Sequence, residues 1–165
     1  MTERAYIALG ANLGATPEAN RATLRGAIAA LVELPTTNLI AQSSFYRTAP
    51  LGYNDQPDFV NAVISIDTAI APQALLLALH GIEERFGRVR SFQNAPRTLD
   101  LDLLCYGARF IATATLTVPH PRLHERAFVL APLVEIAPDL DIPGHGRVDQ
   151  LLARLPDQRI VRLRP

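Results

Sequence analysis

Two aspartates separated by a single residue are the most chemically suggestive feature of this sequence. From residue 99 onward Leu99, Leu101 and Leu103 alternate with Asp100 and Asp102. Side chains of a β-strand point alternately to opposite faces, so the pattern predicts a strand with two carboxylates side by side above a leucine face. A carboxylate pair suits a hard divalent cation such as magnesium, whose remaining ligands are water and phosphate oxygens.

An arginine stands immediately before this acidic strand. Arg97 has a planar guanidinium group, which suits phosphate oxygens better than any other side chain does. Strict alternation would place Arg97 on the leucine face, so we assign it to a loop that precedes the strand. The competing interpretation is an edge strand whose charged face is solvated. A bare Asp-Leu-Asp motif is too short to decide between the two.

Composition indicates an ordinary globular domain, which we expect to span residues 1–165. Apolar residues make up 48% of the chain and the formal net charge is zero, so a nucleic-acid or anionic-membrane partner has no electrostatic support. The apolar runs are too short to cross a bilayer, and the N-terminal residues predict a strand rather than a signal peptide. We expect a monomer.

Cysteine and lysine usage narrows the chemistry. The single cysteine, Cys105, excludes an internal disulfide and favours a cytoplasmic location. It continues the parity of Leu101 and Leu103, so we expect it to be buried on the leucine face. All sixteen basic residues are arginines. The absence of lysine excludes a lysine Schiff base, a lysine nucleophile and a Walker-type phosphate loop.

The order of predicted elements is typical of an α+β, ferredoxin-like fold. Hydrophobic periodicity and end signals predict strands at residues 5–10, 39–47, 59–66 and 98–104, and helices at residues 17–34 and 72–86. The order strand, helix, strand, strand, helix, strand corresponds to a βαββαβ core with an antiparallel sheet and both helices on one face. Further along we expect a short strand at 110–112, helices at 127–137 and 148–155, and a last strand at 159–163.

Two further polar features have alternative interpretations. Asn61 interrupts the apolar row of Phe59 and Val63, so it is either a structural amide or a group that reads a ligand. His120 and His124 are four residues apart, but Pro121 between them disfavours a helical zinc pair. An arginine–histidine phosphate clamp fits this segment better.

Five separated segments together resemble one family. They are IALGANLG at 7–14, SSFYRTAPLG at 43–52, DQPDFVNA at 55–62, PRTLDLD at 96–102 and VPHPRLHERAFVL at 118–130. In this order and spacing the chain resembles 6-hydroxymethyl-7,8-dihydropterin pyrophosphokinases of folate biosynthesis. The resemblance implies transfer of pyrophosphate from ATP to the hydroxymethyl group of the pterin, with release of AMP. It also implies a three-layer α-β-α domain and two Mg²⁺ ions held by Asp100 and Asp102.

The resemblance implies a role for each matching residue. The catalytic group would be Arg88, Arg97, Asp100 and Asp102. The ATP-binding group would be His80, Glu83, Arg88, Arg97, Thr117, His120 and Arg126. The pterin-binding group would be Thr48, Pro50, Leu51, Phe59, Asn61 and Phe128. Asn61 would read the polar edge of the pterin between aromatic faces, which favours the ligand-reading interpretation of this amide.

The sequence departs from the family pattern around the loop that precedes the acidic strand. Asn94-Ala95 stands where many members have Trp-Gly, the loop of residues 88–94 is about one residue shorter, and Thr115 replaces an arginine found in some members. These changes bear on rate and loop closure rather than on the class of reaction. Two alternatives remain: a two-metal nucleotidyltransferase, and a catalytically silent metabolite-binding module on the same fold.

Overall fold

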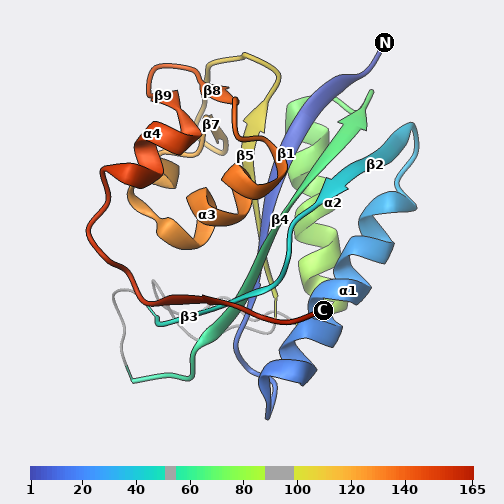
Figure 1. Cartoon of the computed structure of the whole chain (residues 1–165). Coiled ribbons are helices and arrows are strands. Elements are labelled where there is room, and N and C mark those ends of the chain that lie inside the picture. The colour runs from blue at the N-terminus through green and yellow to red at the C-terminus, as the bar shows by residue number, and fades with distance from the viewer. Residues whose placement is uncertain (51–54, 88–98) are drawn as a thin grey trace.

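An antiparallel sheet, whose strands are not in sequence order, forms the framework of the protein (Figure 1). The structure is a computed structural model that describes residues 1–50, 55–87 and 99–165. Its sheet has the strand order β10-β3-β4-β1-β5, with β2 also paired to β4. The bounds of these strands are β1 Glu3–Ala11, β2 Thr37–Gln42, β3 Tyr46–Thr48, β4 Phe59–Thr68, β5 Asp100–Tyr106 and β10 Ile160–Arg162. Each of these pairings is antiparallel.

Helices cover both faces of this sheet. The helices are α1 Pro17–Val32, α2 Pro72–Arg85, α3 Ala127–Ile136 and α4 Val148–Ala153, with a 3-10 turn η1 at Leu123–Glu125. Short hairpins complete the described part: β6 Ile111–Ala112 with β7 Thr117–Val118, and β8 Asp141–Ile142 with β9 Gly146–Arg147. No helix within residues 1–50, 55–87 and 99–165 has both the length and the apolarity needed to cross a bilayer.

Local sequence signals explain where the first two helices begin. Thr16 precedes α1, and its hydroxyl oxygen accepts the N–H of Ala19 at 3.1 Å, which satisfies one of the unpaired donors of the first turn. Pro17 and Pro72 stand at the start of α1 and α2, where a missing N–H costs nothing. Both helices bury their apolar stripes against the sheet.

The apolar core is divided into two clusters by the sheet. One cluster includes Leu101 and other strand residues that face α1 and α2, together with Leu24, Leu31, Leu75 and Leu79 of these helices. Val129, Leu130, Leu133 and Leu151 of α3 and α4 belong to a second cluster on the other face. The predicted α+β, ferredoxin-like fold is therefore confirmed, with α1 and α2 on one face and α3 and α4 making a third layer.

The predicted strand at 39–47 is wrong in one respect, because it consists of two strands. β2 ends at Gln42 and β3 begins at Tyr46, and both pair with β4. At the break, the N–H of Ser43 donates to Val63 O, while the hydroxyl of Ser43 accepts the N–H of Val63 at 2.9 Å. A side chain thus replaces a backbone group in the ladder, and the chain between the two strands turns toward α3.

The predicted position of Cys105 is wrong as well. Cys105 is buried, as expected, but it packs in the cluster beneath α3 and α4 rather than with Leu101 and Leu103. The pairing of β1 with β5 shifts register between Tyr6 and Ile7, where one extra residue of β5 has no partner. A β-bulge of this kind reverses the alternation of side chains. Burial raises the pKa of the Cys105 thiol to about 12.

Candidate functional site

One row of residues crosses the sheet on the face toward α3. Asp100 of β5 pairs with Gly10 of β1, Gly10 pairs with Asn61 of β4, and Asn61 pairs with Tyr46 of β3. Residues paired in this way point to the same face of an antiparallel sheet. Two strand spacings separate Asp100 from Asn61, a distance of about 10 Å between their backbones. Asp100 and the amide singled out from the sequence therefore lie in one row, on either side of Gly10, and Asp102 lies on the same face opposite Ala8.

Gly10 has no side chain, and the amide of Asn61 lies over it. A Cβ atom at this position would lie 2.7 Å from Oδ1 of Asn61 and 3.8 Å from the ring of Phe59. The first distance is shorter than real Cβ contacts allow, and the amide is a short, buried side chain that cannot easily move away. The absence of a side chain at residue 10 thus allows the amide of Asn61 to keep its position.

A pocket of about 280 Å³ lies against β5, at the edge of the sheet. Its lining includes both aspartates and four of the residues predicted to bind ATP, which come from α2 and from the segment after β6: His80, Glu83, Asp100, Asp102, Thr117 and His120. Leu76, Thr115 and Pro121 contribute to the rest of the wall. The structure brings these residues together although they span more than a quarter of the chain.

Glu83 has a structural role as well as a place in this pocket. Its side chain is buried, and its carboxylate accepts the N–H of Leu101 at 2.8 Å. Further along β5, the carbonyl of Leu104 accepts the N–H of His120 at 2.8 Å. Exposed backbone groups of an edge strand must find partners outside the sheet. These two contacts therefore fix the acidic strand against α2 and against the segment that carries His120.

His120 is held as a neutral imidazole. Burial is the main reason that its pKa falls to about 4, and the charge of Arg126 lowers it further, while Asp100 acts in the opposite direction. Its Nδ1 accepts the N–H of Arg122 at 3.2 Å. A neutral ring that accepts at Nδ1 carries its proton on Nε2. His120 can therefore offer an Nε2–H donor to a phosphate oxygen near neutral pH.

The predicted pterin residues gather next to this region. Asn61 and Thr48 are both buried, and Nδ2 of Asn61 donates to the hydroxyl of Thr48 at 2.6 Å. Thr48 and Phe128 line a second pocket of about 250 Å³. The guanidinium of Arg126 lies 5.5 Å from the centre of the Phe128 ring. Arg126 is thus situated between the element predicted to hold the pterin and the histidine predicted to hold phosphate.

Four predicted site residues are not placed in either pocket. Leu51, Arg88 and Arg97 lie outside the described residues. Pro50 is half-buried and directly follows Ala49, which lines the second pocket. The roles of these residues stay predictions.

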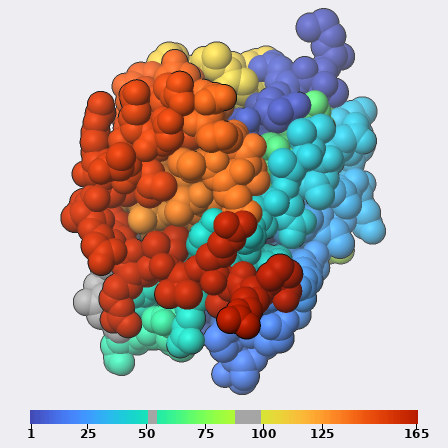
Figure 2. Space-filling model, viewed as in Figure 1, coloured from blue at the N-terminus to red at the C-terminus, as the bar shows by residue number. Residues whose placement is uncertain are grey.

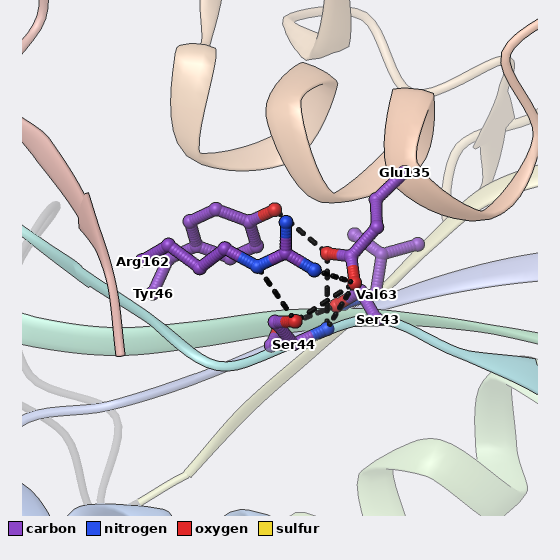
Figure 3. A network of polar contacts seen from close by, with 6 residues as sticks. All are labelled: Ser43, Ser44, Tyr46, Val63, Glu135 and Arg162. Atoms are coloured by element: carbon purple, nitrogen blue, oxygen red, sulfur yellow. Dashed lines mark hydrogen bonds and ion pairs between the residues drawn. The ribbon is translucent and has the colours of Figure 1, made fainter. Parts of the chain in front are cut away.

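A polar network on α3 fixes the start of β3 (Figure 3). The two carboxylate oxygens of Glu135 each lie 3.0 Å from the backbone nitrogen of Ser44, at the break between β2 and β3. Glu135 also accepts from the hydroxyls of Ser44 and Tyr46, at 2.8 and 2.7 Å, and from Arg162 at 2.9 Å. Arg162 in turn donates from Nε to the Ser44 hydroxyl at 2.9 Å.

The charge of Glu135 is well compensated in this network. Burial alone would raise its pKa, but hydrogen bonds from Tyr46 and Ser44 outweigh burial and hold the pKa below its usual value. Burial, together with the bond to Glu135, raises the pKa of Tyr46 to about 12. Two residues further along β3 is Thr48, the partner of Asn61. The network therefore anchors the strand that supports the amide.

Glu135 and Asn12 were not predicted from the sequence as part of the site. Asn12 is fully buried at the end of β1, and its Nδ2 donates to Oε1 of Gln56 at 2.7 Å and to the carbonyl of Pro57 at 3.1 Å. It links the turn after Gly10 to the segment that leads into β4. An asparagine within a glycine-rich turn was the available signal, but turns of that composition are common and its partners lie more than forty residues away.

The chemistry of the donor set fits magnesium bound together with a substrate. Asp100 and Asp102 lie on one face of β5 and line the same pocket. Within the described part of the chain no cluster of three or more histidine, cysteine or acidic side chains is arranged to hold a metal. Magnesium commonly binds through one or two carboxylates and completes its shell with water and phosphate oxygens. A carboxylate pair beside an arginine and histidine cluster matches that pattern.

The fold and the pocket together define a class of protein. An acidic pair on the edge strand of a ferredoxin-like sheet, with neutral His120 and Arg126 close by, is suited to transfer of a phosphoryl-type group from a nucleotide. The model of the 7,8-dihydro-6-hydroxymethylpterin-pyrophosphokinase (HPPK) family matches residues 6–138. The chain belongs to this family.

Individual relatives agree with the family match over nearly the whole chain. The 2-amino-4-hydroxy-6-hydroxymethyldihydropteridine pyrophosphokinase of Haemophilus influenzae is 45% identical over 98% of this chain and 98% of its own length. The protein of the same name from Pseudomonas aeruginosa is 47% identical over 99% of this chain and 98% of its own length. The Bacillus subtilis protein is 44% identical over 86% of this chain.

Solved structures share the fold. Wild-type Plasmodium falciparum HPPK-DHPS with pteroate superimposes with a TM-score of 0.70 at 14% identity, over 93% of this chain. This chain spans 42% of the length of that protein. At this level of identity the likeness supports the α+β fold alone.

Proposed function

We propose that this protein transfers the pyrophosphoryl group of ATP to the hydroxymethyl group of 6-hydroxymethyl-7,8-dihydropterin, as a step in folate biosynthesis. The hydroxyl oxygen of the pterin forms a bond to the β-phosphorus of ATP. The bond between that phosphorus and the α–β bridging oxygen breaks, and AMP leaves with the bridging oxygen. The products are AMP and the pterin diphosphate, and the hydroxyl proton is released.

The observation that carries this proposal is identity of 45% and 47% to pyrophosphokinases over almost the full length of both partners. Several residues that we assign to this reaction belong to the described part of the chain: the acidic pair, the buried amide of Asn61 and the aromatic ring of Phe128. The row from Asp100 to Asn61 supports the same reaction, because it sets the nucleotide side and the pterin side of the site about 10 Å apart.

On the nucleotide side, the protein contributes charge and position. Asp100 and Asp102 would hold two Mg²⁺ ions, and these ions would supply Lewis-acid stabilisation of the charge on the phosphates. His120 donates a hydrogen bond from Nε2–H, and Arg126 provides a fixed positive charge beside it. We also assign Arg88 and Arg97 to the phosphates, and His80, Glu83 and Thr117 to the nucleotide. Phosphoryl-type transfer needs little more than this from a protein.

On the pterin side, the protein contributes shape and hydrogen bonds. Asn61 has one amide hydrogen committed to Thr48 and retains further capacity in the same group for the polar edge of the pterin ring. Phe59 and Phe128 offer aromatic faces, and Thr48, Pro50 and Leu51 complete the pocket in this proposal. Gly10 permits Asn61 to keep the position from which it would bind the pterin, because a Cβ atom at residue 10 would lie 2.7 Å from the amide oxygen.

The two alternative functions are not favoured. A two-metal nucleotidyltransferase would use the same acidic pair, but the matching family and relatives are pyrophosphokinases. A catalytically silent binding module would not account for the two aspartates and His120 in one pocket. We further propose a cytoplasmic monomer with no nucleic-acid partner, in line with the balanced charge.

An AMP-release assay with ATP, magnesium and 6-hydroxymethyl-7,8-dihydropterin tests the proposal. We expect AMP only when the pterin is present, together with a pterin product whose mass has increased by a diphosphate. Release of inorganic pyrophosphate would instead indicate nucleotidyl transfer. ATP binding with no release of either product would indicate the silent module. Omission of magnesium, with excess chelator, is the control for the metal.

A further inference from the structure

The side chain of Gln158 joins the C-terminal segment to the start of α3. Its Nε2–H donates to the carbonyl oxygen of Glu125 at 2.9 Å, and its Oε1 accepts the N–H of Ala127 at 2.9 Å. These two backbone groups lie on either side of Arg126. One amide therefore fixes the peptide groups both before and after the arginine that we place beside the phosphates.

This contact replaces a local helix cap. Arg126 occupies the N-cap position of α3, and its side chain makes no capping hydrogen bond. The first N–H groups of a helix have no partner within the helix, and a short polar side chain at the N-cap usually accepts one of them. Here the acceptor comes from Gln158, 31 residues away. Because the cap is supplied from elsewhere, the N-cap position can be occupied by an arginine.

Arg126 interacts with residues on both sides of the site. The guanidinium of Arg126 lies 5.5 Å from the ring centre of Phe128, in the first turn of α3. The charge of Arg126 also acts on His120. A shift of the backbone at residues 125–127 would therefore move groups on both the nucleotide side and the pterin side.

Gln158 itself belongs to a segment that is fixed at several points. The carbonyl of Arg159 accepts the N–H of Ala49 at 3.2 Å, and Ile160 pairs with Thr48. At the far end, Arg162 donates to Glu135 at 2.9 Å. In Figure 2 this segment lies on the surface in red, next to the orange segments that include α3. The amide of Gln158 thus belongs to the segment that leads into β10, and β10 pairs with β3, the strand that carries Thr48.

We propose that Gln158 is a positioning residue for the transfer reaction. It fixes Arg126 and Phe128 relative to the strand that carries Thr48. The inference rests on the proposed function and deepens it. Gln158 acts through the backbone at residues 125–127, and its effect reaches both substrates because Arg126 and Phe128 serve different ones.

Two substitutions separate the two hydrogen bonds. Gln158→Ala removes both, whereas Gln158→Glu keeps an acceptor for the N–H of Ala127 and loses the donor to Glu125. We expect Gln158→Ala to raise KM for ATP and KM for the pterin by about tenfold each, and Gln158→Glu to have an intermediate effect. Gln150→Ala is the matched control, because Gln150 is an exposed glutamine on α4. It should leave both KM values unchanged.

A second measurement does not depend on the reaction. Amide hydrogen exchange at Ala127 should become faster in Gln158→Ala and should stay slow in Gln158→Glu. Unchanged KM values with a lower melting temperature would show that Gln158 only stabilises the fold, and would overturn the proposal. Wild-type exchange at Ala127 in Gln158→Ala would overturn it too. Failure of the unsubstituted protein to release AMP would contradict the proposed function instead, and exchange at Ala127 would still test the contact.

Discussion

The two faces of the sheet differ in kind, although the same strands supply both. On the face toward α1 and α2, Leu9 and Leu101 are 1% and 3% exposed and belong to a continuous apolar core. Gly10, which follows Leu9, and Asp100, which precedes Leu101, point to the opposite face. Together with Asn61 of β4 they form the row that faces α3. At these positions the first face provides packing between apolar side chains, and the second has polar groups that packing alone would not require.

The difference shows how stability and chemistry are linked in this fold. A slip of one residue in β1 or β5 would exchange the two faces, so burial of the leucines fixes the register and thereby the position of Asp100 and Asp102. The packing of these leucines therefore positions the two aspartates, although the leucine side chains point to the opposite face. Substitutions at adjacent residues should consequently give opposite results when stability and turnover are measured on the same variants.

The largest effect on turnover is expected from Asp102→Asn. The substitution preserves the shape of the side chain and removes one of two charges available for magnesium, so turnover should fall roughly a thousandfold. The melting temperature should stay within a few degrees of the unsubstituted value. AMP release and thermal unfolding measure the two quantities. Asp141→Asn, at an exposed position of β8, is the control; near-normal turnover of Asp102→Asn would contradict the metal assignment.

The converse is expected from Leu101→Ala. Removal of a side chain that is 3% exposed should lower the free energy of unfolding by about 2–5 kcal/mol. Turnover per folded molecule should fall far less than in Asp102→Asn. Denaturant titration gives the stability. The matched control is Leu77→Ala on α2, where the leucine is 64% exposed and the loss should be small. Equal losses for the two leucines would mean that the apolar face is not the source of stability.

Much of the fold follows from local patterns in the sequence. The alternation around Asp100, the proline and threonine signals at the start of α1, and the order of elements were sufficient to predict the ferredoxin-like core. The break at Ser43 was not predictable, because no glycine or proline interrupts residues 39–47 and only the partner strand reveals the side-chain contact. The bulge in β5 likewise depends on how β1 pairs with it, which local periodicity does not encode.

The site divides along similar lines. Asp100, Asn61 and Phe128 stood out because each lies within a recognisable segment. Glu135 and Gln158 did not, because their partners are 89 and 31 residues away and each is an ordinary polar residue within its own segment. Residues that bind a substrate carry a local signature, whereas those that hold such residues in place are defined only by the packing of distant elements.

Gly10→Ala sharpens the comparison, since it adds a single methyl group to the polar face. The new Cβ would lie 2.7 Å from Oδ1 of Asn61 and would displace the amide. We expect KM for the pterin to rise by about tenfold, an effect of about 1.4 kcal/mol, with a smaller change in KM for ATP. Steady-state kinetics with each substrate varied in turn measures this. Gly81→Ala on α2, where a Cβ would meet nothing within 4 Å, should leave both KM values unchanged.

A smaller effect, on pH dependence, is expected from His120. Its pKa falls from an ordinary value of 6.5 to about 4 in the folded protein, mainly through burial. Between these values the unfolded chain binds more protons at this residue than the folded protein does, so His120 makes stability decrease as the pH falls from 6.5 toward 4. The protein should therefore lose part of its stability in acid before most carboxylates titrate.

Comparison with His120→Asn isolates this contribution. Asparagine at this position retains an oxygen that can accept the N–H of Arg122, but it cannot be protonated. Denaturant titrations of both proteins between pH 7 and 4.5 should show a steeper loss of stability for the unsubstituted chain. His145, whose pKa is also lowered by burial and by His124, contributes equally to both proteins and cancels in the difference. Parallel curves would mean that His120 is accessible to solvent and protonated like an ordinary surface histidine.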